Sequence, residues 1–175
     1  MPPVRTYHHG NLRAALLESA EQTLAEGGEI SLRELARKVG VSHAAPRRHF
    51  FDKQELLDEL ALDGFRRLGA QLAEALAGED PLAAWARTYV RFATEHAALL
   101  ELMFAGKHRS RELMAASHRC FSPAFALFES ERTGVVAFAT LHGLAGLINS
   151  GMLAAERLDE HVSDAIEQIR RGLVV

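Results

Sequence analysis

Apolar residues recur every three or four positions along most of the chain. This spacing places them on one face of an α-helix. It predicts a first helix over 11–26 and, after residue 53, further helices over 54–77, 81–95, 97–105, 109–130, 134–155 and 159–173. Glycine or proline stands near most of these boundaries, as expected at helix ends. The predicted fold is therefore all-α.

A more compact pattern lies between the first helix and the others, in the stretch SLRELARKVGVSHAAPRRHFFDK, which begins at Ser31. Ser31 followed by Glu34 predicts a capping box at the start of a short helix that ends at Gly40. Ser42 is suited to cap a second short helix, predicted to run through Phe50. Two short helices joined by a tight turn form a helix-turn-helix, whose second helix can enter the major groove of DNA.

Hydrogen-bond donors gather on the second of these predicted helices. Guanidinium groups match guanine edges and phosphates, and alanine leaves room for thymine methyl groups. The predicted DNA-facing residues are Ser42, His43, Ala44, Ala45, Arg47, Arg48, His49 and Lys53. For this stretch taken alone, the alternative to a DNA-binding element is a simple αα corner in a helical core. Such a corner would not need these donors.

Charge is distributed unevenly along the chain. The 175 residues carry a net charge of −3, which by itself argues against general affinity for nucleic acid. Residues 1–53 hold eight Lys/Arg and six Asp/Glu, a net of +2, and the rest hold twelve and seventeen, a net of −5. The positive part is thus the part with the helix-turn-helix pattern, as expected of a DNA-binding element.

Composition bears on the compartment and on the membrane. The single cysteine, Cys120, forms no intrachain disulfide, which fits a reducing cytoplasm. No apolar run approaches the roughly 20 residues that span a bilayer, so no membrane partner is expected. A cytoplasmic location is therefore predicted.

The helices predicted after residue 53 are rich in large apolar side chains with few polar tips, as small-molecule sites are. The candidate ligand-binding residues are Phe65, Trp85, Tyr89, Phe92, Met103, Phe104, Phe121, Phe125, Phe138 and His142. Most of them must be ordinary core, and only some would line a cavity. His142 is the polar candidate, with a helix-packing histidine as the alternative. The expected effector is a small apolar or aromatic molecule.

Small residues suggest where two copies of the chain would meet. Gly143, Gly146 and Ser150 recur at spacings of three and four, so they share a helical face that can approach another helix closely. Together with the apolar side of 159–173 they form the predicted seam of a homodimer.

The sequence shows no sign of catalysis. It has no Gly-rich phosphate loop, no metal-ligand spacing and no nucleophile in a recognisable motif, so we expect no enzyme, no cofactor and no metal site. An enzyme is the alternative functional class to a DNA-binding protein. A third interpretation is a helical interaction module whose helix-turn-helix binds protein, and failure to bind any DNA would favour it.

Two stretches resemble the TetR family of transcriptional repressors: YHHGNLRAALLESA at 7–20 and SLRELARKVGVSHAAPRRHFFDKQELL at 31–57. Together they cover about a quarter of the chain and include the Gly-Val-Ser turn, the His-Phe pair and the Asp-Lys pair before a long helix. The segment LHGLAGL at 141–147 further resembles a subgroup whose ligand domain carries Trp followed by His-Gly, although Phe138 stands at the Trp position.

The resemblance implies an N-terminal three-helix helix-turn-helix DNA-binding domain (1–53) and a C-terminal helical ligand-binding and dimerisation bundle (54–175). It implies a homodimer that binds palindromic half-sites of double-stranded DNA. Such a ligand-responsive transcriptional regulator would be a repressor, released from its operator by a small-molecule effector. The resemblance also implies that Arg33 contacts a base or a phosphate. Where the family usually has an aromatic residue, most often Tyr, this chain has Arg47, which predicts a steeper salt dependence of DNA binding.

Overall fold

The computed structural model describes residues 9–106 and 108–172, and all regular secondary structure in these residues is helical. Eight α-helices and two short 3-10 helices make up the regular structure of these residues. In chain order they are α1 (His9–Ala25), α2 (Leu32–Val39), η1 (Pro46–Arg48), α3 (Lys53–Leu76), α4 (Pro81–Glu95), α5 (Ala97–Gly106), α6 (Arg111–Phe125), α7 (Glu131–Asn149), η2 (Ala155–Arg157) and α8 (Leu158–Gly172). The predicted all-α fold is confirmed.

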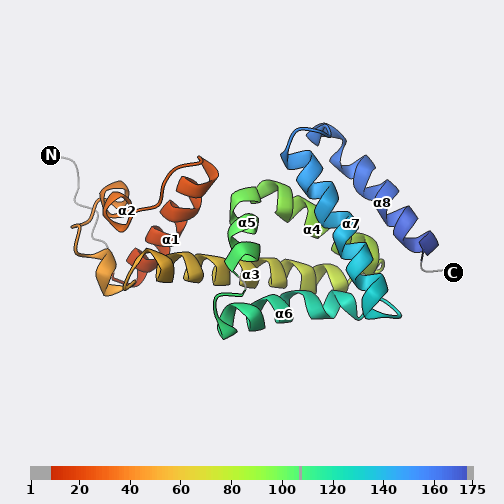
Figure 1. The fold of residues 1–175 in the computed structure, drawn as a ribbon, viewed down its shortest axis with the longest axis horizontal. Coiled ribbons are helices and arrows are strands. Elements are labelled where there is room, and N and C mark those ends of the chain that lie inside the picture. Colours follow the sequence, from red (N-terminus) through yellow and green to blue (C-terminus); the bar gives the residue numbers. More distant parts are fainter. Residues whose placement is uncertain (1–8, 107, 173–175) are drawn as a thin grey trace.

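Helix α3 runs along the long axis of an elongated molecule (Figure 1). Helices α1 and α2 and the 3-10 helix η1 lie at its N-terminal end, and we call these three elements the reading head. Helices α4, α5 and α6 pack on α3, and α7 and α8 pack on α4 and on each other; we call α4 to α8 the bundle. Helix α3 therefore contacts both the reading head and the bundle.

Side-chain caps set the starts of α3 and α4. The carboxylate of Asp52 accepts a hydrogen bond of 2.9 Å from the backbone N–H three residues on, and Asp80 does the same for α4 at 3.2 Å. Pro81 occupies the first position of α4, where its missing N–H costs nothing. These local signals explain why both helices begin within one residue of their predicted starts.

The α6–α7 connection differs from the prediction. Helix α6 ends at Phe125, soon after Pro123, rather than at residue 130. Helix α7 begins three residues before its predicted start, because the hydroxyl of Ser130 caps it by accepting from the backbone N–H of Thr133. It also ends earlier than predicted, at Asn149, just before Gly151 turns left-handed with a φ of +73°.

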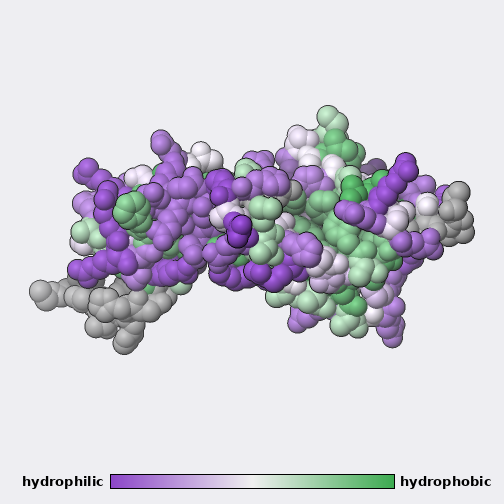
Figure 2. Space-filling view, turned by 60° about the horizontal axis from the view of Figure 1, so that its bottom comes forward, coloured by the Kyte–Doolittle hydropathy of each residue, from purple (hydrophilic) through white to green (hydrophobic). Residues whose placement is uncertain are grey.

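The core is continuous from the reading head to the bundle. Along α3 the side chains of Leu60, Phe65, Leu68 and Leu72 are at most 2% exposed. Hydrophilic residues cover the reading head in the space-filling view, whereas apolar residues gather over the bundle (Figure 2). None of the described helices combines the length and the apolar character needed to cross a membrane.

Candidate DNA-binding and ligand sites

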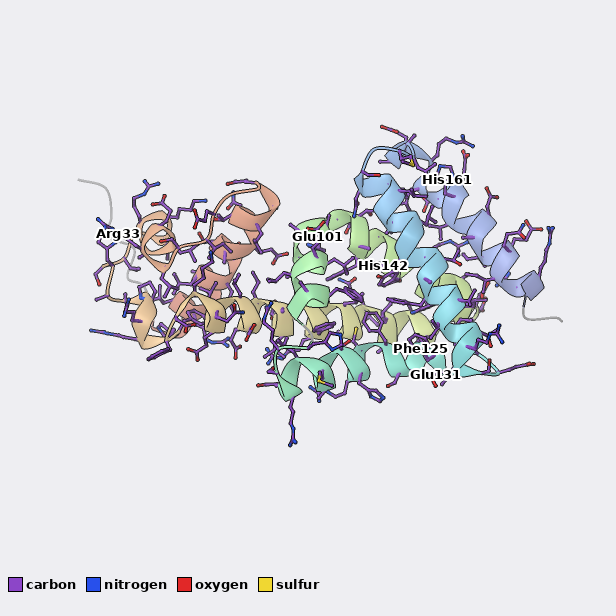
Figure 3. The ribbon with its side chains drawn as sticks, in the orientation of Figure 1. Arg33, Glu101, Phe125, Glu131, His142 and His161 are labelled. Carbon is purple, nitrogen blue, oxygen red and sulfur yellow. The ribbon has the colours of Figure 1, made fainter. Side chains whose placement is uncertain are left out.

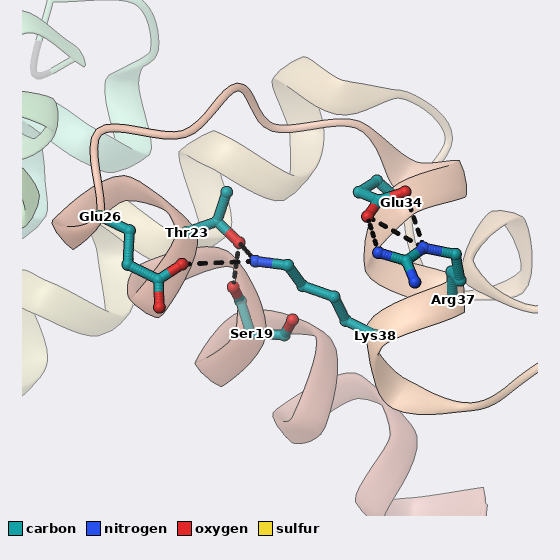
Figure 4. A network of polar contacts seen from close by, with 6 residues as sticks. All are labelled: Ser19, Thr23, Glu26, Glu34, Arg37 and Lys38. Carbon is teal, nitrogen blue, oxygen red and sulfur yellow. Dashed lines mark hydrogen bonds and ion pairs between the residues drawn. The ribbon is translucent and has the colours of Figure 1, made fainter.

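A polar network holds α2 against α1 (Figure 4). The ammonium group of Lys38 donates to the hydroxyl of Thr23 at 2.9 Å and lies 3.7 Å from the carboxylate of Glu26. The same hydroxyl donates to the carbonyl of Ser19 at 2.7 Å. Thr23 is only 4% exposed, and both its proton and an oxygen lone pair are used, as buried polar groups require. The network therefore fixes how α2 sits on α1.

The capping box predicted at the start of α2 is wrong. Ser31 occupies the N-cap position but its side chain makes no capping hydrogen bond. Glu34 instead accepts hydrogen bonds from Arg37, which lower the pKa of its carboxyl group (Figure 4). Gly40 ends α2 as predicted, with a left-handed φ of +79° that suits a residue without a side chain.

The prediction that the second helix of the helix-turn-helix is a continuous α-helix is also wrong. Residues 42–50, which we call the recognition segment, form a turn followed by the 3-10 helix η1. The cause is Pro46, which has no N–H to donate and whose ring conflicts with the carbonyl four residues earlier. Hydrogen bonds over three residues replace the α-helical pattern, from Ala45 to Ser42 at 2.9 Å and from Arg48 to Ala45 at 3.1 Å.

Two buried side chains anchor the recognition segment. Pro46 is buried and Phe50 is 1% exposed, and the N–H of Phe50 donates to the carbonyl of Pro46 at 3.0 Å. Between and around these anchors, side chains face solvent. The predicted DNA-facing residues Ser42, His43, Ala44, Arg47, Arg48 and Lys53 are exposed, as is Arg33 on α2, while Ala45 and His49 are half-buried.

Unpaired positive charge distinguishes this surface. Within the described part of the chain, none of Arg33, Arg47, Arg48 and Lys53 forms an ion pair. Other cations of the reading head do, as in the pairing of Arg13 with Glu59. Figure 3 shows Arg33 at the end of the molecule farthest from α7 and α8. The elements that carry the other three cations, η1 and the start of α3, lie at the same end of the molecule (Figure 1).

A carboxylate of α1 ties the reading head to the bundle. Glu21 accepts two hydrogen bonds of 2.8 Å from the guanidinium group of Arg67 on α3. Nδ1 of His96, which lies between α4 and α5, is 3.1 Å from the same carboxylate. Glu21 therefore contacts α3 and the α4–α5 junction at one point.

The bundle contains a cluster of aromatic rings around Phe138 on α7. Its ring centroid lies 5.1 Å from those of Tyr89 and Phe121 and 6.1 Å from that of Phe104. The hydroxyl of Tyr89 lies 2.8 Å from Nδ1 of His142, and burial raises the pKa of this hydroxyl, so it stays protonated. The cluster packs α4, α5, α6 and α7 together.

A groove of about 470 Å³ opens beside this cluster, between α5, α6 and α7. We call it the aromatic groove. Its lining residues are Phe104, Ser117, His118, Phe121, Ser122, Phe125, Glu131, Val135 and Phe138. Four of the ten candidate ligand-binding residues thus meet here: Phe104, Phe121, Phe125 and Phe138.

The other six candidates lie elsewhere. Phe65 lines a separate groove of about 240 Å³ between α3 and α6. His142 is exposed and lines a third groove, of about 290 Å³, together with Glu101 (Figure 3). The remaining four are core side chains at most 2% exposed: Trp85, Tyr89, Phe92 and Met103.

The sequence reasoning did not single out the polar residues of the aromatic groove, Ser117, His118, Ser122 and Glu131. A signal was present, because Ser117 and Phe121 are four residues apart, as are His118 and Ser122. Glu131 was not among the predicted site residues, because its helix was predicted to begin at residue 134.

Of the two surfaces predicted to form the dimer seam, only the one on α7 is open to a second chain. A Cβ added to Gly143 or Gly146 would meet no atom within 4 Å, and Ser150 is exposed, so this face of α7 is open. Val135, Val136 and Leu147 add exposed apolar area to the same helix, at 50%, 61% and 40% exposure. The apolar side of α8, the other predicted half, is instead buried within the chain: Val162 and Ile166 are at most 4% exposed and α8 packs on α4 and α7.

Several solved structures share this fold. A protein of unknown function from Rhodococcus sp. RHA1 is 43% identical over 97% of this chain and 99% of its own, with a TM-score of 0.82. The TetR-family transcriptional regulator PfmR from Thermus thermophilus is 23% identical over 90% and 98%, with a TM-score of 0.69. The TetR-like regulator LfrR from Mycobacterium smegmatis, solved with proflavine, is 18% identical over 89% and 94%, with a TM-score of 0.66. No protein-family model and no curated protein matches the chain.

Proposed function

We propose that this chain, whose fold is that of TetR-family transcriptional regulators, is a DNA-binding repressor that acts as a homodimer and leaves its operator when a small-molecule effector binds. The observation that carries the proposal is the group of unpaired cations on the outer end of the reading head. Core packing does not require them, because all four are exposed and none forms an ion pair with a carboxylate among the described residues.

These cations suit a DNA backbone. Arg47 and Arg48 lie on η1, Lys53 begins α3, and Arg33 lies on α2, so they approach a duplex from three elements. Each phosphate that a cation neutralises releases counterions, and affinity falls steeply with salt as a result. The small side chain of Ala44 and the imidazole of His43 are the candidates for base edges.

Dimerisation would use the open face of α7. Gly143 and Gly146 let a second helix approach closely, and the exposed valines and Leu147 supply apolar area. A two-fold axis there would place two reading heads on one face of the DNA, which matches palindromic half-sites.

The aromatic groove is the proposed effector site. It lies against α6, which packs along α3, and α3 begins in the reading head. Arg109, between α5 and α6, also donates to Asp58 of α3 at 2.9 Å. Glu21 links α1 to α3 and to His96. An effector that binds better when α6 and α3 are shifted would therefore turn the reading head away from its half-site.

Replacement of single arginines tests the DNA-binding part of the proposal. A preferred sequence is first selected from genomic DNA with the purified full chain. Arg47→Ala and Arg48→Ala should each lower affinity for it at least tenfold in fluorescence anisotropy and flatten the salt dependence, with unchanged helicity. Arg87→Ala is the matched control, since Arg87 is an exposed arginine of α4, far from the reading head. A wild-type chain that prefers no DNA sequence over competitor DNA would overturn the proposal.

A further inference from the structure

Phe51, in the loop between η1 and α3, has the most exposed large apolar side chain of the described residues, at 83%. The other large apolar side chains that are open to solvent in the described part of the chain lie in the bundle, on α6, on α7 or in the connections that follow these helices. A single exposed apolar residue needs no explanation by itself. The surroundings of Phe51 therefore decide what its ring can contact.

Hydrogen bonds on both sides of Phe51 hold its backbone. Phe50, the preceding residue, is 1% exposed, and its N–H donates to the carbonyl of Pro46 at 3.0 Å. The N–H of Phe51 donates to the carboxylate of Glu55, and the N–H of Glu55 donates to the carboxylate of Asp52 at 2.9 Å. Because Phe50 fills the core and these bonds fix the chain after it, the ring of Phe51 is left outside.

Positive charge flanks this exposed ring. Arg47 and Arg48 precede Phe51 by four and three residues, and Lys53 follows it by two. All three cations are exposed, and none forms an ion pair within the described residues. The loop that carries Phe51 lies at the same end of the molecule as η1 and the start of α3 (Figure 1). This surface thus suits a partner that offers anionic groups beside an apolar one.

Duplex DNA has both kinds of group. Its phosphates are the anionic groups, and the 5-methyl group of thymine is an apolar group on a base edge in the major groove. A phenylalanine ring can pack against this methyl group, whereas cytosine has none at the same place. A contact with Phe51 would therefore distinguish thymine from the other bases.

We propose that Phe51 is a specificity-determining residue, whose ring packs against the methyl group of a thymine at the edge of each half-site. The recognition segment ends at Phe50, so the ring follows directly after the segment that holds the candidate base contacts His43 and Ala44. The inference rests on the proposed function, because it takes the chain to bind DNA through this surface.

Deoxyuridine in place of thymine tests the contact, because it removes only the methyl group. Each thymine of the DNA selected with the wild-type full chain is replaced singly, and affinities are measured by fluorescence anisotropy. Loss of one buried methyl group should weaken wild-type binding about fourfold at one position of each half-site. In Phe51→Ala the same replacement should change nothing, and replacements at other thymines should act as in wild type. Selection with Phe51→Ala should lose the preference for thymine at that position.

Two further variants serve as controls. Phe51→Leu keeps an apolar side chain and should retain part of the preference for thymine. Met114→Ala removes an apolar side chain that is 52% exposed on α6, and it should bind every DNA as wild type does. Circular dichroism should show the same helicity in all variants, because both replaced side chains are exposed.

The outcomes separate this inference from the proposed function. If wild type prefers one DNA sequence, three results would overturn the inference alone. These are wild-type affinity in Phe51→Ala, an equal loss of affinity in Phe51→Ala whether thymine or deoxyuridine stands at each position, and a selected half-site without thymine. A wild-type chain that prefers no DNA sequence would overturn the proposed function and this inference with it.

Discussion

Glu21 of α1 and Arg67 of α3 form a two-pronged ion pair, with both nitrogen–oxygen distances at 2.8 Å. The carboxylate of Glu21 is 20% exposed and Arg67 is 36% exposed, so water screens the pair only partly. We expect Glu21→Ala to lower the free energy of unfolding by about 1–2 kcal/mol, less than a fully buried charged pair would lose. Urea denaturation of the single and double variants with Arg67→Ala measures the coupling directly.

The surface pair of Arg91 with Asp159, whose side chains are 56% and 68% exposed, is the control. Its double-mutant cycle should give no more than about 0.5 kcal/mol. Equal couplings for the two pairs would contradict a special role for Glu21 in joining the reading head to the bundle.

Restoring an N–H at position 46 should lengthen the helix of the recognition segment. In Pro46→Ala the steric conflict is gone, so we expect α-helical Cα chemical shifts over 43–50 and a small gain in helicity. Pro81→Ala is the control, since proline is tolerated at the first position of α4 and its replacement should leave the helix bounds unchanged. Unchanged shifts over 43–50 in Pro46→Ala would mean that Pro46 is not the cause.

Alanine at Gly143 and Gly146 separates helix stability from dimerisation. Each Cβ would point into open space, so in the monomer each substitution should stabilise α7 by about 1 kcal/mol. If this face pairs with a second chain, the added methyl groups hold the helices apart and weaken the dimer. Sedimentation velocity at micromolar concentrations gives the dissociation constant. A dimer as tight as wild type would place the seam elsewhere.

Two glycines of α3 form a matched pair for packing. A Cβ on Gly64 would lie 2.6 Å from the sulfur of Met103, which is fully buried on α5, whereas one on Gly69 would lie no closer than 3.7 Å to any atom. Gly64→Ala should therefore destabilise the chain by about 1–3 kcal/mol. Gly69→Ala should be neutral or stabilising. Thermal unfolding of both variants checks the order, and a more stable Gly64→Ala would contradict it.

Asp80 should contribute stability that depends on pH. The hydrogen bond from Arg170 and that from the N–H of Ala83 lower the pKa of its carboxyl group. Its contribution is therefore complete above the unfolded-state pKa of about 4 and is lost as the pH falls through the lower folded-state pKa. Asn is also a good N-cap, so Asp80→Asn removes mainly the charge. Melting temperatures of both proteins should differ at pH 7 and converge toward pH 3; a constant difference would contradict the assignment.

Local signals predicted much of this fold, and packing decided the rest. The Asp80-Pro81 start of α4 acts within one turn and was readable from the sequence. Pro46 was equally visible, but the second short helix was predicted from its capping residue without regard to this proline, whereas the missing N–H of Pro46 prevails in the structure. The apolar side of α8 was correctly seen as buried; an amphipathic face does not tell whether its partner is the same chain or another copy.

The ligand candidates show the same limit. Phe125 and Trp85 are both large aromatic residues of predicted bundle helices, but one lines the aromatic groove and the other lies in the core. That difference depends on how each helix packs on its neighbours, and Gly134 permits the close approach of Phe125, because a Cβ there would lie 2.5 Å from its ring. Single-helix periodicity carries no such information.

If the chain binds DNA as proposed, Pro46 affects the kinetics of that binding. A proline ring fixes φ near −65°, and here the ring is itself buried, so the recognition segment has few conformations to lose when it docks. A short segment held this way approaches a groove as a rigid body. Association should then be limited by the encounter and by long-range electrostatic attraction rather than by folding of the segment on the DNA.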